Sequence, residues 1–76
     1  MPHVIVKLYA GRTKQQKAKL AEQITRAVTT TLKCGEEAVS VAIEDVEPNA
    51  WTEQVYKKDI LRSPETIYKK PGYNPL

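Results

Sequence analysis

The chain has 76 residues, with 12 Lys and Arg spread among 9 Asp and Glu, and a formal net charge of +3. A chain of this length forms a single domain, residues 1–76, and buries only about 60% of its unfolded surface, so its own core is marginal. The mixed distribution of charge argues against a nucleic-acid partner, which needs a clustered basic surface.

The cysteine and histidine content argues against an intrachain disulfide and against a metal site. Cys34 is the single cysteine, so no disulfide forms within the chain, and no cluster of His and Cys predicts a metal or a cofactor site. We therefore expect homo-oligomerisation to supply the missing stability. A lone thiol indicates a reducing compartment. The chain has neither an apolar run of about 18 residues nor a signal peptide, so we expect a cytoplasmic protein with no membrane partner.

The first predicted element is a β-strand over residues 3–9, HVIVKLY, in which side chains alternate between two faces that both carry apolar groups. Pro2 precedes this strand, where a missing backbone N–H costs nothing because it lies outside the hydrogen-bonded ladder. An initiator methionine is normally removed when a small residue follows it. Pro2 is therefore also a candidate free secondary amine.

A long helix is predicted over residues 13–33. Thr13 is a candidate N-cap, and Gln16 three residues later completes a capping box. Gly35 is the predicted C-terminal stop. The apolar residues between them recur on one helical face: Leu20, Ala21, Ile24, Ala27, Val28 and Leu32.

A second strand is predicted from the alternation of Val39, Val41 and Ile43, and it ends before Pro48. Strand, long helix and strand form a βαβ unit, an α+β architecture in which the crossover is right-handed and the strands run parallel. Two parallel strands leave one sheet face and both edges bare. We therefore expect a homodimer in which two such units form one four-stranded sheet.

The tail predicts short C-terminal helices. Trp51 and the apolar residues after it lie at helical spacing, which predicts a helix around residues 50–60. Ser63 followed by Pro64 predicts the start of another helix around residues 64–70. This tail would occupy the surface on which dimers otherwise stack, so we favour a dimer over a hexamer.

Few residues of the chain offer chemistry. His3 and Cys34 are the only histidine and the only thiol, and there is neither a nucleophile triad nor a glycine-rich phosphate loop. A free α-amino group has a pKa near 7.7 to 8.0, so a terminal Pro2 nitrogen would suit a general base at neutral pH. Arg12 carries a planar guanidinium that matches a carboxylate. The large aromatic residue Trp51 is the remaining candidate for the functional site.

The segment MPHVIVKLYAGRTKQQKAKLAEQIT resembles the N-terminal half of the 4-oxalocrotonate tautomerase family, in which a strand begins with a catalytic proline, an arginine follows its far end and a long helix comes next. Pro2 and Arg12 stand at those positions. AVSVAIEDVEPNAW resembles the family's second strand and the loop that brings an aromatic residue, here Trp51, to the pocket. The tail KKPGY resembles the longer, bacterial branch of the family. The resemblance covers nearly the whole chain.

The resemblance implies a cofactor-independent isomerase, a keto–enol tautomerase for a small 2-keto or 2-hydroxy acid. In the family the proline nitrogen carries the proton as general base and arginine binds the substrate carboxylate, and these roles fall to Pro2 and Arg12. Trp51 would form an apolar wall that excludes water. If Met1 is retained, the Pro2 nitrogen is an amide, and we expect the protein to be inactive.

Ser40 departs from the family pattern, because many members carry a second arginine at this position in the second strand. Ser40 is still expected among the substrate-binding residues, with Arg12 and Trp51. Arg62 or a side chain from a second copy is a candidate replacement for the missing arginine. The substrate is then expected to be small or singly charged, such as an aryl or alkyl pyruvate.

Two other functions fit parts of the pattern. A tautomerase-like scaffold without the second arginine, and without a free proline, would be a non-catalytic binding module for a small acid or a protein partner. The net positive charge and the adjacent lysines at 57–58 and 69–70 leave a small basic nucleic-acid binder as a third alternative. The intact mass of the native protein separates the first two, and a steep salt dependence would identify the third.

Overall fold

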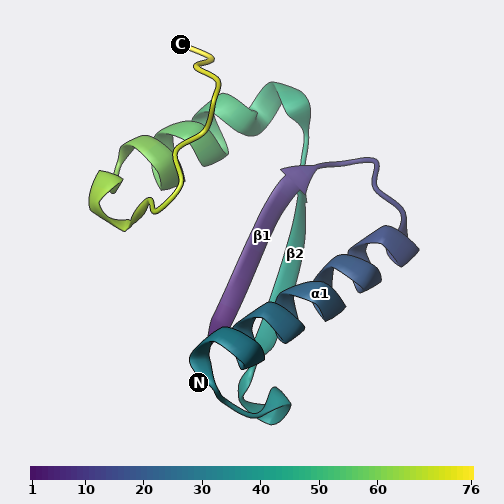
Figure 1. Cartoon of the computed structure of the whole chain (residues 1–76). Helices are drawn as coiled ribbons and strands as arrows, with labels where there is room; N and C mark the ends of the chain where they lie inside the picture. Colours follow the sequence, from purple (N-terminus) through teal and green to yellow (C-terminus); the bar gives the residue numbers. More distant parts are fainter.

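The computed structural model describes residues 1–76, which form a βαβ unit followed by a helical tail (Figure 1). β1, His3–Tyr9, and β2, Ser40–Val46, form a two-stranded parallel sheet. His3 lies opposite Ser40, and Tyr9 lies opposite Val46. α1, Lys14–Leu32, connects the end of β1 to the start of β2. The predicted α+β fold and βαβ topology are confirmed.

α1 begins with the predicted capping box. The Gln16 backbone N–H donates to Thr13 Oγ1 at 3.0 Å, and the Thr13 N–H donates to Gln16 Oε1 at 2.9 Å. The expectation that Gly35 stops the helix is wrong, because Lys33 already adopts the left-handed conformation with φ 56° and ψ 49°. Gly35 has extended backbone and precedes a 3₁₀ turn at Glu36–Ala38. The predicted end of the helix near Lys33 is confirmed, since α1 ends at Leu32 and Lys33 is its C-cap.

α1 covers one face of the sheet and leaves the other face open. Lys17 of α1 forms an ion pair with Asp45 of β2 at 2.7 Å, and Leu8 of β1 shares a shallow hollow with side chains of α1. Because side chains alternate along a strand, Ile5 and Tyr9 belong to the opposite face. They are 53% and 50% exposed. The sheet therefore has an apolar face that α1 does not cover.

The first predicted tail helix is present in a different form. Residues Thr52–Leu61 form a π-helix, which follows Trp51 and a 3₁₀ turn at Pro48–Ala50. π-helical geometry is rare, is seen mostly as a single turn inside an α-helix, and is frequent at functional sites. The helix predicted around residues 50–60 is thus confirmed in position, while its wider winding was not predicted.

The prediction of a second tail helix over residues 64–70 is wrong. Only Pro64–Thr66 turns, as a short 3₁₀ helix, and the Ser63 side chain makes no capping hydrogen bond. Pro71 disfavours helical backbone at Lys70, the residue before it. The short stretch between the turn and Pro71 is too small to offset the cost of nucleating an α-helix.

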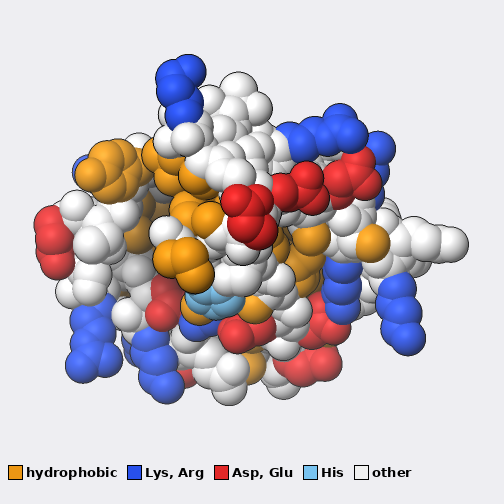
Figure 2. All heavy atoms as spheres, turned by 90° about the horizontal axis from the view of Figure 1, so that it is seen from below, with side chains coloured by type: hydrophobic (Ala, Val, Ile, Leu, Met, Phe, Trp, Pro, Cys, Tyr) orange, Lys and Arg blue, Asp and Glu red, His pale blue; other side chains and the backbone are white.

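The chain by itself has a very small core. Val55 and Tyr56, both on the π-helix, are the only buried residues, with 5% and 6% of their surface exposed. Figure 2 shows hydrophobic side chains at the surface in the middle of one face, bordered by Asp and Glu side chains, with most Lys and Arg side chains toward the margin. So little burial in a chain of this size supports the expectation that a second copy contributes to stability. No helix has both the length and the apolar character that a membrane crossing requires.

Candidate active site

Pro2 and Ser40 come together where the two strands begin. The Ser40 backbone N–H donates to the Pro2 carbonyl oxygen at 3.1 Å, which fixes the backbone directly ahead of β1. The Ser40 hydroxyl is engaged by its neighbour across the sheet, since Ser40 Oγ and His3 Nδ1 share a hydrogen bond of 2.6 Å. Met1 is fully exposed. Pro2 therefore stands at an accessible end of the sheet, beside two polar side chains.

Arg12 lies beyond the opposite end of β1. Gly11 allows the turn that leads to it, because the φ of +122° at Gly11 is a conformation that residues with a side chain rarely adopt. Arg12 lines a shallow hollow of about 200 Å³ beside Leu8 and Gln16. It forms no ion pair within the chain. Its guanidinium is therefore free to bind an external anion.

Trp51 follows β2 and packs against the end of β1. Its ring meets that of Tyr9 edge to face, with centroids 5.2 Å apart and an interplanar angle of 80°. Its indole Nε1 donates a hydrogen bond of 2.9 Å to Tyr73 Oη in the C-terminal arm. Tyr9, Trp51 and Tyr73 line a small hollow of about 180 Å³. This hollow offers an apolar wall at the end of the sheet where Arg12 also lies.

The four predicted site residues form two groups in one chain. Pro2 and Ser40 lie where the strands begin, whereas Arg12 and Trp51 lie beyond the ends of the strands. The seven residues of β1 separate the groups, which is roughly 20 Å at the usual rise of a strand. Arg62 ends the π-helix, is exposed and forms no ion pair. No single chain assembles the complete predicted site.

The face of the sheet that α1 leaves open carries a partly exposed ion pair near Trp51. Lys7 Nζ and Asp59 Oδ2 form an ion pair at 2.6 Å, and both residues line a hollow of about 400 Å³ with Trp51 and Val55. The hydrogen bond that Lys7 Nζ donates to Asp59 and the negative charges of Asp59 and Glu44 raise the pKa of Lys7, against a smaller opposing effect of desolvation. This ion pair joins the π-helix to β1.

Sequence reasoning missed three residues that contact the candidates. Tyr9 and Tyr73 hold the Trp51 ring, and His3 binds the Ser40 side chain. Strand alternation and the parallel register could have indicated Tyr9 and His3, because both lie on the face that α1 leaves open. Nothing in the local sequence indicates that Tyr73, 22 residues from Trp51, returns to it.

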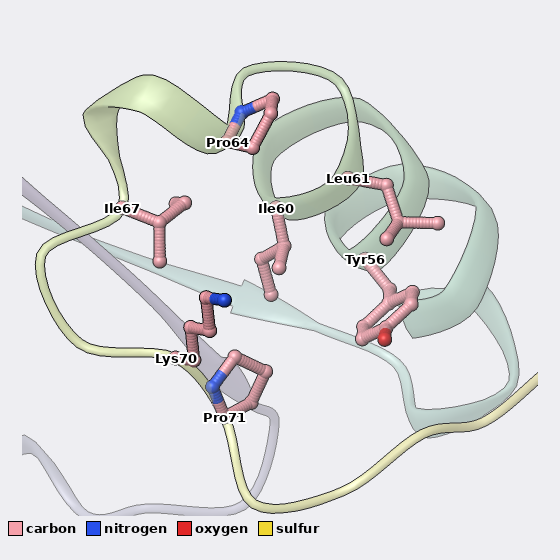
Figure 3. A pocket seen from close by; sticks show the side chains of 7 residues that line it. All are labelled: Tyr56, Ile60, Leu61, Pro64, Ile67, Lys70 and Pro71. Carbon is pink, nitrogen blue, oxygen red and sulfur yellow. The ribbon is translucent and has the colours of Figure 1, made fainter.

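A further hollow of about 300 Å³ lies within the tail, away from the predicted residues. Tyr56, Ile60 and Ile67 supply apolar walls, and Lys70 and Pro71 close one side (Figure 3). It includes none of the predicted site residues. We therefore place the candidate active site at the two ends of the sheet.

The sequence matches the model of a known protein family and several curated proteins. Residues 2–58 match the family described as tautomerase enzyme. A protein of Xylella fastidiosa named "Probable tautomerase" is 42% identical over 76 residues, which is 100% of this chain and 93% of that protein. Tautomerase PptA of Klebsiella pneumoniae (strain 342) is 41% identical over 97% of this chain and 99% of its own length.

Several solved structures are also similar to this chain in sequence and in fold. TomN, described as a 4-oxalocrotonate tautomerase homologue in the tomaymycin biosynthetic pathway, is 40% identical and superposes with a TM-score of 0.64 over 66% of this chain and 77% of that one. YwhB, described as a homologue of 4-oxalocrotonate tautomerase, is 43% identical with a TM-score of 0.59 over 60% of this chain and 75% of that one. Sequence and fold therefore agree on the kind of protein that this chain resembles.

Proposed function

The chain belongs to the tautomerase family, and on this premise we propose that it is a keto–enol tautomerase that acts on a small 2-keto or 2-hydroxy acid with Pro2 as general base. One observation carries the proposal. The family match begins at Pro2, and the Pro2 carbonyl accepts a hydrogen bond of 3.1 Å from Ser40, so the residue has a defined place at an accessible strand end.

Removal of Met1 would convert the Pro2 nitrogen into a secondary amine whose pKa lies near neutrality, as for other α-amino groups. This amine takes a proton from the carbon beside the substrate carbonyl, and the electron pair of the broken C–H bond moves to the carbonyl oxygen as an enolate. The proton then returns to that oxygen to give the enol, or the steps run in reverse. The pyrrolidine ring limits the motion of the nitrogen, which keeps it aimed at the substrate.

Arg12 is the carboxylate anchor in this proposal. Its guanidinium has no anionic partner within the chain, and a planar fork suits two parallel hydrogen bonds to a carboxylate. Because Arg12 and Pro2 lie at opposite ends of β1, they act on one substrate only if two copies share the site. We propose a homodimer in which Pro2 of one copy faces Arg12 and Trp51 of the other.

The charge of the two strands supports β1 as the edge that pairs in the dimer. β2 carries Glu44, which forms no ion pair within the chain, and charged side chains protect an edge from pairing. Lys7 of β1 is already paired with Asp59. If two β1 edges pair antiparallel about an axis near their midpoint, the first residue of each strand lies beside the last residue of the other. That arrangement would complete the site twice in each dimer.

Ser40 sets the proposed substrate class. Its side chain is short and uncharged, and its hydroxyl is already bound to His3 at 2.6 Å. The site as proposed then holds one guanidinium per substrate, which suits one carboxylate better than two. Trp51 and Tyr9 add an apolar wall. We therefore propose a monocarboxylate with an apolar group, such as an aryl or alkyl pyruvate.

A comparison of protein with and without Met1 tests the proposal, because the Pro2 nitrogen is an amine only when Met1 has been removed. Protein whose intact mass shows that Met1 is absent should ketonise an enolised pyruvate faster than buffer does, while protein that keeps Met1 should not. Pro2→Ala retains an amine but disturbs its aim and its pKa, so we expect a loss of about 10- to 1,000-fold in turnover. Pro75→Ala, in the exposed C-terminal arm, is the matched control and should keep full activity. Equal turnover above the buffer rate with and without Met1 would exclude Pro2 as the base, whereas no turnover in either form would favour a binding module.

A further inference from the structure

The C-terminal arm of the chain returns to Trp51. Tyr73 Oη accepts the hydrogen bond from Trp51 Nε1 at 2.9 Å, across 22 residues of sequence. The indole nitrogen is a donor only, so this hydroxyl is its one partner within the chain. The contact joins the end of β2, through Trp51, to a segment with no regular secondary structure.

Tyr73 is itself supported by the small core. Its ring lies 5.7 Å from that of Tyr56, at an interplanar angle of 45°. Tyr56 is one of the two buried residues of the chain. Lys70 and Pro71, just before Tyr73 in the sequence, line the tail hollow beside Tyr56 (Figure 3). The arm is thus anchored against the π-helix before it reaches Trp51.

Trp51 is held from two directions. Tyr9 of β1 contacts its ring edge to face, and Tyr73 binds its nitrogen. An edge-to-face contact limits the tilt of a ring, and a hydrogen bond to the indole nitrogen limits its rotation within the plane. Without the Tyr73 hydroxyl, only the contact with Tyr9 would orient the indole.

We propose that Tyr73 is a positioning residue that holds the Trp51 indole in the orientation required of an apolar wall. This inference rests on the proposed function only in that Trp51 faces the substrate. Tyr73 acts through Trp51 and carries no proton in the reaction. The KKPGY segment is then a support for the site, formed by residues far from it in sequence.

Tyr73→Phe is the sharpest test, because it keeps the ring on Tyr56 and removes only the hydroxyl. Trp51 is the single tryptophan of the chain, so fluorescence reports on it directly and without any substrate. We expect a shift in Trp51 emission and stronger quenching by acrylamide. In processed, active protein we expect a rise of about 2- to 10-fold in KM, the range for one lost neutral hydrogen bond, with a smaller change in kcat and an unchanged pH profile.

Tyr68→Phe is the matched control. Tyr68 lies in the same tail, is 98% exposed and makes no aromatic contact or hydrogen bond, so its variant should leave both readouts unchanged. Unaltered emission and quenching in Tyr73→Phe would overturn the positioning role, whatever the activity. Altered emission with wild-type KM in active protein would also overturn it. Altered emission in protein whose Met1-free form has no tautomerase activity would support the contact and refute the proposed function instead.

Discussion

Pro2 and Arg12 lie at opposite ends of β1, with the seven residues His3–Tyr9 between them. Ser40 lies beside Pro2 at the start of β1, and Trp51 lies at the other end of the strand, as Arg12 does. A small carboxylic acid cannot reach across a strand of roughly 20 Å. If Pro2 is the base and Arg12 the carboxylate anchor, as we propose, the site requires a second copy of the chain in opposite orientation.

The first prediction is that the protein forms a dimer at micromolar concentration. Only Val55 and Tyr56 are buried in the single chain, and both sheet edges are free for pairing. Sedimentation equilibrium should give twice the chain mass of 8.6 kDa. A stable, folded monomer at this concentration would contradict the shared sheet, and a mass of six chains would contradict the choice of a dimer over a hexamer.

The second prediction concerns mixed dimers of two impaired variants. Pro2→Ala and Arg12→Ala each damage both sites of a homodimer. In a heterodimer, one site combines the intact Pro2 with the intact Arg12, and the other site carries both substitutions. Random mixing makes half of the dimers heterodimers, so activity should recover to about a quarter of the wild-type value. The measurement is turnover after the two variants are unfolded and refolded together. No recovery above the separate variants would contradict a site shared between copies.

The third prediction is that Arg12→Ala weakens the binding of a 2-keto acid by about 10- to 100-fold, because a hydrogen bond to a charged group contributes about 1.5 to 3 kcal/mol. Substrate titration or inhibition by a non-reactive carboxylate measures the change. Arg26→Ala is the matched control, since Arg26 lies on α1 and pairs with Glu22 at 3.3 Å. His3→Ala and Cys34→Ser should keep turnover within a few-fold. Loss of activity in Cys34→Ser with normal binding in Arg12→Ala would reverse these assignments.

The fourth prediction uses the ion pair that joins β1 to the π-helix. The hydrogen bond that Lys7 donates to Asp59 raises the pKa of Lys7 above its ordinary value of 10.5, so the protonated form is stabilised by folding. The contribution of the pair to stability is therefore complete below that pH and disappears as the pH rises through the higher folded-state pKa. Urea unfolding should show that Asp59→Asn is less stable than the wild type at pH 7 and that the difference shrinks in strongly alkaline buffer.

The control for this pair is Glu65→Gln, which removes an acid with no ion-pair partner. Its stability relative to the wild type should show no such convergence at high pH. A difference between wild type and Asp59→Asn that stays constant through the alkaline range would mean that the contact of Asp59 with Lys7 is not the source of the effect.

The βαβ unit could be predicted from local signals in the sequence. The alternation of residues 3–9 placed β1, and the reciprocal bonding pattern of Thr13 and Gln16 placed the start of α1. These signals are reliable because they depend on neighbours a few residues away. Two details were predicted wrongly: Lys33, not Gly35, adopts the left-handed conformation at the end of α1, and only Pro64–Thr66 of the helix expected at 64–70 turns. The first is unexpected because a left-handed C-cap usually falls on glycine, and the second follows from the proline at 71.

The sequence by itself determined which residue types are available for chemistry: one proline behind Met1, one arginine after the first strand, one tryptophan after the second. The predicted strand over residues 3–9 already separates Pro2 from Arg12. Only the tertiary structure fixed the parallel register that places Ser40 beside His3 at the start of β1 and Trp51 beside Tyr9 at its end. Only the tertiary structure also brought Tyr73 to Trp51. A contact across 22 residues depends on the packing of the tail on Tyr56, and no periodicity of the chain encodes it.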